Sequence, residues 1–411
     1  MQGEVFMSNA APANYWWWFG SDSAAAASAG TRDFLVPLLA LSVSVSAAQA
    51  GMVSTIQLLL TQALLIPGGL VIDRFGRRGL VTVNASVNAV VLLFLSALAL
   101  TGNLTLPVLI GAAIILGVCT GLFGEASDAL LRSIVTQERY PKAITVNEGR
   151  DAALRLAAAP AGSALMGIAS GLGLLISGVF SAIAGVLITR VRGISGPQNQ
   201  KETTVRSQVA EAYTWLKGTR RAVLLAMLVG SVNFSVAGVM TTTQFAIFLR
   251  TREALDVGII TMSAGISVIV GAVLAQAVLD RVPTGILIPA LFAWLGAGMT
   301  TLAFFHTGAA LVVVLMATFL GVPSLNGAMS GFFFSSTPDE LQGRVHAILA
   351  SFTLGLGALA PAVAGFVLQH WGTGWAYAMA LTPMVIALTA ALLSTRIREL
   401  PTPENWHKYE L

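Results

Sequence analysis

The sequence predicts an all-α membrane protein in which twelve transmembrane helices form two six-helix bundles. The 411-residue chain is 55% hydrophobic and only 10% charged, whereas soluble domains carry about 25% charged residues. It contains twelve apolar runs of roughly 20 residues, each long enough to cross a hydrocarbon core of about 30 Å as a helix. Short motifs of the first half also recur in the second half. A lipid bilayer is therefore the expected surrounding of most of the chain.

The first six predicted spans precede a long polar stretch, and the first of them is the least typical. It opens with Trp16, Trp17 and Trp18, a pattern typical of the membrane interface, yet it carries charged residues further on. The six spans are 15–41, 50–72, 80–101, 106–131, 146–168 and 172–189.

Six further spans follow the polar stretch 190–221, which we interpret as a cytoplasmic linker. Residues 205–217 of this linker are predicted to form an amphipathic helix on the membrane surface. The sequence thus predicts an N-terminal bundle at 1–189 and a C-terminal bundle at 222–411. The six later spans are 222–249, 257–279, 285–305, 309–335, 345–369 and 375–395.

The distribution of Lys and Arg predicts the orientation of the chain. With both termini inside, the inside loops hold 18 of the 23 basic residues, and the outside loops hold only Arg250 and Arg252. Cytoplasmic loops of membrane proteins carry such an excess. We therefore expect cytoplasmic termini in a bacterial inner membrane. The net charge of +4 is attributed to topology rather than to a nucleic-acid partner.

Four pairs of short motifs recur in the same order in the two halves. The copies are offset by 201 to 207 residues, which favours a duplicated six-helix unit. Because six spans return the chain to the same side of the membrane, the copies are predicted to be related in the parallel sense. The pairs are Asp73-Arg74 with Asp280-Arg281, Gly117-Val118 with Gly321-Val322, Thr136 and Glu138 with Thr337 and Asp339, and Ala159-Pro160 with Ala360-Pro361.

The loop between the second and third predicted spans combines glycines, an aspartate and arginines. Gly76 permits a tight turn, and the arginines favour the cytoplasmic surface. Together with 33–38, 136–162 and 337–365, this loop makes the chain resemble the major facilitator superfamily, closest to its branch of macrolide and siderophore exporters. The residues of the signature loop are Gly69, Asp73, Arg74, Gly76, Arg77 and Arg78.

This resemblance implies a proton-driven antiporter in which two bundles rock about a central cavity. In the family the signature aspartate, here Asp73, contacts the start of the eleventh helix and keeps the cytoplasmic side closed. The chain departs from the drug-antiporter pattern at the fourth helix, because Arg132 lies at its cytoplasmic end and not deep within it. It also departs at the fifth helix, where Arg155, Ala159, Pro160 and Ala164 occupy the places of a glycine-rich motif.

Charged residues within the predicted spans are confined to the first half. An ionisable side chain in a membrane helix is costly unless it is paired or hydrated, so each is a candidate functional group. Spans seven to twelve contain no Asp, Glu, Lys or Arg, which predicts that the first half handles protons. The candidates are Asp22, Arg32, Asp33, Glu125, Asp128, Glu148, Arg150, Asp151 and Arg155.

The fourth and fifth spans share one charge spacing, with two acids and an arginine at i, i+3 and i+7. Each set lies on one helical face, and a straight antiparallel hairpin would bring the two faces together. Two ion pairs would then flank a carboxylate pair that shares a proton, because nearby like charges disfavour double ionisation. The alternative is a static cytoplasmic latch with the signature loop. The expected neighbours are Glu125 with Arg155, Asp128 with Asp151, and Arg132 with Glu148 or, in the latch, with Asp73.

Asp33 is a further candidate for protonation or for binding a cationic substrate. We expect Asp33 to face the cavity, with Arg155 as a candidate partner. The alternative is an internal pair with Arg32, which helical geometry disfavours because adjacent residues point about 100° apart. The second half offers uncharged polar and aromatic groups for an amphipathic substrate cavity. These groups are Asn233, Gln244, Gln276, Trp294, Asn326 and Phe332.

No cofactor or metal is expected. Cys119 is the single cysteine, and the four histidines lack ligand spacing. No ATP-binding loop or nucleophile constellation is present, which argues against an enzyme. We interpret the chain as a monomeric transporter that uses the proton gradient to export a moderately hydrophobic small molecule, such as a drug or siderophore. The alternatives are a proton symporter that imports a small solute, and a receptor or lipid-handling protein that does not translocate.

Overall fold

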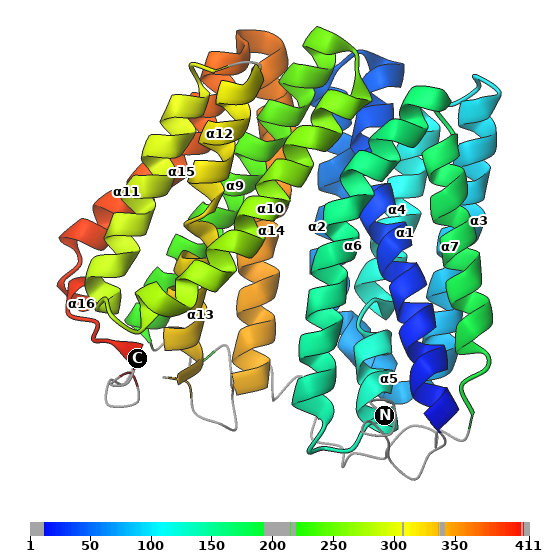
Figure 1. Ribbon diagram of the computed structural model, residues 1–411, viewed down its shortest axis with the longest axis horizontal. Helices are drawn as coiled ribbons and strands as arrows, with labels where there is room; N and C mark the ends of the chain where they lie inside the picture. The colour runs from blue at the N-terminus through cyan, green and yellow to red at the C-terminus, as the bar shows by residue number, and fades with distance from the viewer. Residues whose placement is uncertain are drawn as a thin grey trace. The chain divides into compact units, whose positions relative to one another are not determined.

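The computed structural model describes residues 12–192, 214, 219–305, 308–335, 337, 342–403 and 406. This part of the chain is almost entirely α-helical (Figure 1). Each of the twelve predicted spans coincides with one long helix or with two consecutive helices, which confirms the all-α prediction. Apart from Thr214, the predicted amphipathic helix at 205–217 lies outside the described residues.

The helices before residue 192 follow the first six predicted spans. They are α1 (Pro12–Ser44), α2 (Ala47–Arg74), α3 (Arg77–Leu100), α4 (Leu106–Phe123), α5 (Ala126–Ile134), α6 (Tyr140–Ile168) and α7 (Leu172–Ile188). The helices after residue 219 follow the other six spans and add one short helix. They are α9 (Arg220–Thr251), α10 (Ala254–Leu279), α11 (Thr284–Leu302), α12 (Gly308–Phe319), α13 (Val322–Ser335), α14 (Gln342–Trp371), α15 (Thr373–Leu393) and α16 (Thr395–Arg398).

The chain divides into two compact units, and most of each unit comes from one half of the sequence. The first unit contains Met1–Val45, Ile56–Lys201 and Glu253–Ile259. The second unit contains Ser46–Thr55, Glu202–Arg252 and Ile260–Leu411.

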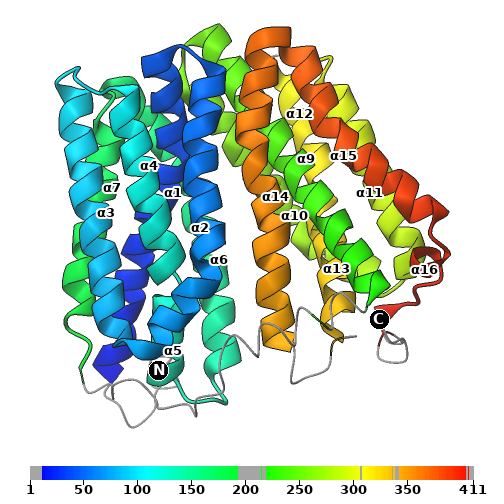
Figure 2. The ribbon, with the colours of Figure 1, turned by 180° about the vertical axis from the view of Figure 1, so that it is seen from behind.

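The same helix neighbours recur in the two units. In the first, α1 packs against α6 and α7, and α3 packs against α4, α5 and α7 (Figures 1 and 2). In the second, α9 packs against α14 and α15, and α11 packs against α12, α13 and α15. The order of helices along the chain therefore generates one packing scheme twice.

A close approach between helices at a glycine also recurs. A Cβ atom at Gly68 of α2 would clash with the carbonyl oxygen of Gly121 in α4. A Cβ atom at Gly271 of α10 would clash with the carbonyl oxygen of Leu320, directly after α12. Glycine allows two helix backbones to approach this closely in a membrane. Gly68 and Gly271 are 203 residues apart, within the offset of the sequence repeats.

The fourth and tenth predicted spans are each interrupted. α4 ends at Phe123 and α5 begins at Ala126, with a turn at Gly124 and Glu125 between them. A similar turn separates α12 from α13. The prediction of one continuous helix in each span was wrong in this detail, because apolar content is a property of the whole segment and does not register a local turn.

Nine segments of the described chain are long and apolar enough to cross a membrane by themselves. α7 is apolar but has only 17 residues, whereas α1 and α6 carry several charged side chains. The protein is a multi-pass membrane protein in which the first unit holds the most polar helices.

Candidate functional site

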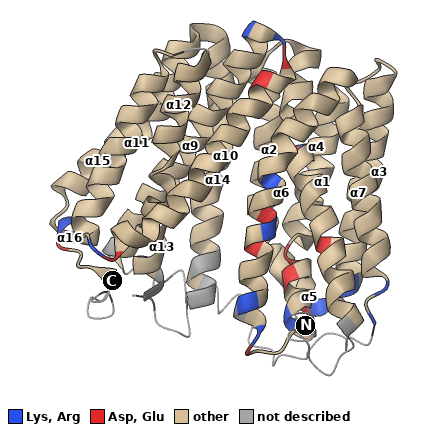
Figure 3. Ribbon diagram, viewed as in Figure 1, with Lys and Arg blue, Asp and Glu red and all other residues tan. Residues whose placement is uncertain are grey.

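Charged side chains gather inside the first unit. Figure 3 shows acidic and basic residues along α6 and around α5, whereas α11, α12 and α15 of the second unit are uncharged along their length. An uncompensated charge within a membrane helix is costly, so the partners of these residues determine what the first unit can do.

Arg150 of α6 links this helix to α1. Its Nη2 donates to Oδ2 of Asp22 on α1 and to Oδ1 of Asp151, the latter at 2.8 Å. Its Nη1 lies 3.3 Å from Oγ of Ser23, and its guanidinium stands over the ring of Phe19 at 5.0 Å. Only 11% of the Arg150 side chain and 17% of the Asp22 side chain are exposed. A mostly buried cation is thus balanced by carboxylates from α1 and α6.

α5 joins this network through Ser127, whose Oγ donates to Oδ1 of Asp22. The indole N–H of Trp18 lies 3.1 Å from both the carbonyl oxygen and Oγ of Ser127. Trp18 is fully buried. Asp22 is therefore held from two sides, by Ser127 of α5 and by Arg150 of α6.

Asp128 follows Ser127 and, like Glu125 and Glu148, has no hydrogen bond or ion pair to another described residue. Four other carboxylates lie close enough to interact with it electrostatically, and they are Asp22, Glu125, Glu148 and Asp151. The first unit therefore brings five carboxylates together, two of which, Asp22 and Asp151, contact Arg150.

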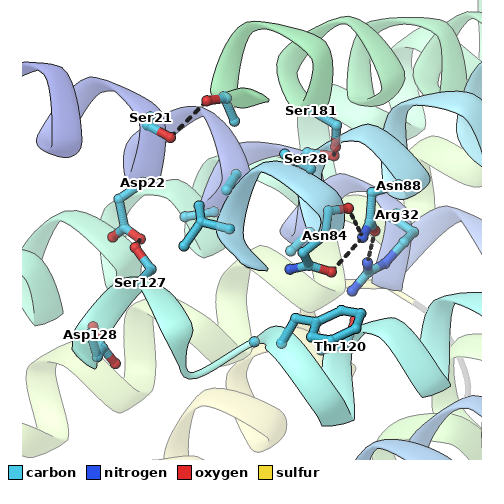
Figure 4. Close-up of a pocket in the computed structure, with 18 of the residues that line it drawn as sticks. Ser21, Asp22, Ser28, Arg32, Asn84, Asn88, Thr120, Ser127, Asp128 and Ser181 are labelled. Carbon is cyan, nitrogen blue, oxygen red and sulfur yellow. Dashed lines mark hydrogen bonds between the residues drawn. The ribbon is translucent and has the colours of Figure 1, made fainter. Parts of the chain in front are cut away.

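A cavity of about 260 Å³ with polar side chains at both ends lies inside the first unit, bounded by α1 and α3 to α7. Asp22 and Asp128 line one end of it, and Arg32, Asn84 and Asn88 line the other (Figure 4). Serine hydroxyls of α1 and α7 lie along its wall. The cavity connects an acidic end to a basic end within a single unit.

Arg32 is held in the cavity wall and is only 5% exposed. Its Nη1 donates to Oδ1 of Asn88 at 2.6 Å, and the Asn88 amide donates to the carbonyl oxygen and Oδ1 of Asn84. Its Nε donates to Oδ1 of Asp33 at 2.9 Å, and Gln57 donates to the same oxygen at 3.0 Å. The prediction that Arg32 and Asp33 do not pair was wrong, because the long arginine side chain bends along the helix to reach its neighbour.

Arg132 and Glu148 do not form the predicted ion pair. Nε of Arg132 donates to the hydroxyl of Tyr140 at 2.7 Å, and the guanidinium stands over the same ring. Glu148 is exposed. Arg132 therefore connects α5 to the start of α6 through Tyr140 and not through an ion pair.

The predicted pair of Glu125 with Arg155 is also absent among the described residues. The Arg155 side chain is 71% exposed, and its ion pair is a 4.0 Å contact with Oδ2 of Asp151. Glu125 is exposed at the turn before α5. The predicted pairs do not form because the fourth span consists of two helices, α4 and α5, and because Asp22 of α1 pairs with Arg150 of α6.

The signature loop joins α2 to α3 and is bound to α5 and α7. Nη1 of Arg77 donates to the carbonyl oxygen of Ala129 at 2.9 Å and to Oγ of Ser133 at 2.6 Å. Nη2 of Arg78 donates to the carbonyl oxygen of Thr189 at 2.8 Å. Two of its arginines thus fix the position of this loop within the first unit.

The rest of the signature loop is exposed, namely Gly69, Asp73, Arg74 and Gly76. Gly76 has φ −62° and ψ 116°, an extended conformation open to any residue, so the expected turn does not depend on a glycine at this position. The gating contact of Asp73 stays a prediction.

The residues predicted to line a substrate cavity lie on four helices of the second unit. Gln244 donates to Oγ1 of Thr261 at 3.0 Å. Trp294 donates to a backbone carbonyl oxygen, and Phe332 is fully buried against Trp406. Asn233 is half-buried, whereas Gln276 and Asn326 are exposed. Their role in substrate binding stays a prediction.

The neutral members of the site were not predicted from the sequence, and they are Gln57, Asn84, Asn88 and Ser127. Asn84 and Asn88 stand at i and i+4 in an uncharged span, and this spacing places two amides on one face of the helix. That pattern was a signal in the sequence. Ser127 and Gln57 carry no comparable signal, because single hydroxyl and amide groups are common in membrane helices.

No group of three His, Cys, Asp or Glu side chains within the described ranges is arranged to hold a metal ion. The functional groups of the site are therefore carboxylates, guanidinium groups, amides and hydroxyls. Such groups handle protons and polar ligands directly.

A sequence family described as the Major Facilitator Superfamily matches residues 23–360. No curated protein matches the chain at a significant level. Three solved transporters are similar in structure. A bacterial homologue of the iron transporter ferroportin has a TM-score of 0.73 and 15% identity, covering 94% of this chain and 98% of its own. The nucleoside transporter NupG has a TM-score of 0.71 and 15% identity, covering 92% of this chain and 98% of its own. A D-xylose-proton symporter has a TM-score of 0.65 and 16% identity, covering 97% of this chain and 100% of its own.

At these identities the likeness to solved structures concerns the fold alone. The sequence match to the family is independent of it and extends over most of the chain. The chain therefore belongs to the Major Facilitator Superfamily and is a membrane transporter of small molecules, not an enzyme.

Proposed function

We propose that this transporter works as a monomer in a bacterial cytoplasmic membrane and couples proton entry to the export of a moderately hydrophobic small molecule. The observation that carries the proposal is the cluster of five carboxylates around Asp128, two of which, Asp22 and Asp151, contact the mostly buried Arg150. Nearby like charges disfavour simultaneous ionisation, so such a cluster readily takes up and releases a proton.

Arg150 has alternative partners, and protonation would choose between them. When Asp22 is ionised, Arg150 links α6 to α1. When Asp22 is protonated, the guanidinium is left to Asp151 of its own helix, and the link between the two helices weakens. A proton would then favour one packing of the first unit over another, which is the differential affinity that a population shift requires.

The substrate class is argued from the second half of the chain. Its predicted cavity residues are amides and aromatic rings without charge, such as Asn233, Gln244 and Trp294. Pockets of this composition suit neutral amphipathic compounds. The resemblance of the signature loop and of 136–162 to macrolide and siderophore exporters supports the same class.

The test uses purified protein in liposomes that contain a pH-sensitive dye. Candidate compounds are added outside, one chemical class at a time, and the internal pH is followed. Antiport predicts that substrate entry moves protons out of the vesicle. Proton movement in the same direction as the substrate would overturn the export proposal in favour of symport, and binding without any flux would favour a receptor.

Two variants locate the proton carrier. Asp128→Asn is expected to abolish substrate-driven proton movement, because it removes the carboxylate around which the other four gather while keeping its shape. Asp280→Asn is the matched control, because this aspartate is exposed and lies outside the proposed site. Asp33→Asn is measured in the same way. Full coupling in both the Asp128 and Asp33 variants would contradict proton handling by these two carboxylates.

A further inference from the structure

The cavity inside the first unit is large enough to hold a chain of water molecules. Its ends are marked by Asp22 and Arg32 on α1, and ten helical residues span about 15 Å. A volume of about 260 Å³ is many times the roughly 10–15 Å³ of accessible space that one buried water molecule needs. Several water molecules can therefore lie between the two ends.

The wall of the cavity carries hydrogen-bonding groups from several helices among alanine and other apolar side chains. Oγ of Ser28 on α1 and Oγ of Ser181 on α7 lie 2.7 Å apart, and both residues line the cavity. Asn84 lines it from α3, Thr120 from α4 and Ser127 from α5. Buried water needs two to four polar partners. These groups are the partners that water in the cavity would use.

The acidic end of the cavity can exchange protons with such a chain. Asp128 and Asp22 both line it, and Asp128 has no hydrogen-bonding or ion-pair partner among the described residues. Water and carboxylates both donate and accept protons, so a proton can pass between the chain and either side chain.

The basic end cannot pass a proton on. A guanidinium group has five N–H donors, no acceptor, and is not deprotonated in proteins. Its positive charge also repels hydronium, the same effect by which an arginine excludes protons from a water channel. Asn88 and Asp33 hold Arg32 in place at 2.6 and 2.9 Å. Asp33 does not line the cavity and is half exposed, so Arg32 separates the cavity from it.

We propose that the cavity holds a chain of water that exchanges protons with Asp22 and Asp128, and that Arg32 ends this chain and prevents protons from leaking through the first unit. The inference rests on the proposed proton coupling and adds a proton path separate from the substrate. Asn88 acts as a positioning residue, because it fixes Arg32 and carries no proton itself.

The test measures proton leak without any substrate. Liposomes containing the protein and an internal pH dye are given a potassium diffusion potential, and the rate of acidification is recorded. Arg32→Gln is expected to leak at least about 10-fold faster than the wild type, because a full charge repels hydronium strongly at short range. Arg252→Gln is the matched control, because this arginine is exposed and far along the sequence in the second unit. Arg252→Gln should leak protons at the wild-type rate.

A plugged variant distinguishes a leak through the cavity from a loosened bundle. Ala29 lines the cavity, and Ala29→Leu adds three carbon atoms to its wall. The double variant Arg32→Gln/Ala29→Leu should have the low proton leak rate of the wild type. The inference would be overturned if the proton leak persisted in the double variant, or if Arg32→Gln leaked no faster than the wild type. If Arg32→Gln does not fold, Asn88→Ala takes its place. A smaller increase in leak rate is expected for Asn88→Ala, and a rate equal to that of the wild type would again overturn the inference.

The inference and the proposed function fail separately. A wild type that moves protons with substrate, combined with a tight Arg32→Gln variant, would retain proton coupling and overturn the water chain. A wild type that transports substrate without proton movement, combined with a leak that the plug abolishes, would retain the water chain and its barrier while overturning the coupling.

Discussion

Arg150 balances two carboxylates from different helices of the first unit. It contacts Asp22 and Asp151, and its own side chain is 11% exposed. Without it, two mostly buried carboxylates would lie close together with no cation between them. Removing one partner of a buried ion pair costs more than the pair itself contributes, because the remaining charge stays desolvated.

Arg150→Gln is therefore expected to lower the free energy of unfolding by about 3 kcal/mol. The measurement is the unfolding midpoint in detergent, followed by tryptophan fluorescence. Arg155→Gln is the stability control, because its side chain is 71% exposed and an exposed pair contributes at most about 1 kcal/mol. Asp22→Asn/Arg150→Gln should recover part of the loss, and a double variant less stable than Arg150→Gln would contradict the assignment.

The sequence identified the charged residues of this site but not their partners. Asp22, Arg150 and Asp151 stand out because ionisable groups are rare in apolar spans. Their pairing depends on the rotation of α1 relative to α6, and no pattern within either helix records that rotation. The pairing of Arg32 with Asp33 depends on a side-chain rotamer, which helical spacing alone does not determine.

At the scale of helices, one face of α4 is shaped by glycines. A Cβ atom at Gly117 would lie 2.7 Å from the carbonyl oxygen of Gln57, and one at Gly121 would lie 2.8 Å from that of Thr61. Both oxygens belong to α2. The two glycines are four residues apart, so they lie on the same face and let α2 and α4 pack backbone to backbone.

Gly121→Ala is expected to lower the free energy of unfolding by about 1–3 kcal/mol, because the added methyl group has no room against α2. Gly111→Ala on the same helix is the matched control, because nothing lies within 4 Å of its added Cβ. It should be neutral or stabilising by up to about 1 kcal/mol. The unfolding midpoints of the two variants are compared, and equal values would contradict the packing argument.

The existence of the helices followed from the sequence, whereas their interruptions did not. Apolar length predicted the segments because lipid selects for it. The turn at Gly124 and Glu125 depends on how α5 meets Asp22 and Trp18 of α1 through Ser127. Such contacts join residues more than 100 positions apart, so no local sequence pattern predicts the end of α4.

At the scale of the whole molecule, the two units share a packing scheme but not a charge distribution. Lys and Arg residues are also unevenly distributed between the two sides of the membrane. The loops and the tail assigned to the inside hold 18 of them, and the loops assigned to the outside hold two. This asymmetry is the basis for the proposed orientation, with the loop after α2 in the cytoplasm and the turn after α9 outside.

The orientation can be tested by cysteine labelling. In a Cys119→Ser background, Phe75→Cys and Arg252→Cys each place one thiol at an exposed position. A membrane-impermeant maleimide should label Arg252→Cys in intact cells and Phe75→Cys only after permeabilisation. The reverse pattern would show that the chain is inserted the other way.

The two halves resemble each other in sequence only through scattered motif pairs, and their structural likeness is also limited in kind. What the units share is the order of helix contacts and a glycine where α2 meets α4 and where α10 meets the end of α12. Many different apolar residues satisfy such contacts, so two units can repeat one packing scheme with little sequence likeness. That the halves arose by duplication stays a prediction.

The ionic link between α1 and α6 also bears on how the protein is made. Neither helix is among the segments of the described chain that are apolar enough to cross a membrane by themselves. α1 is synthesised first, and Asp22 meets its counter-ion only when Arg150 emerges 128 residues later. Until then the aspartate has no cation to offset its transfer into lipid, which favours a delay of α1 at the insertion machinery or the bilayer surface. The first unit would then enter the bilayer as a group of helices, in an order set by its electrostatics.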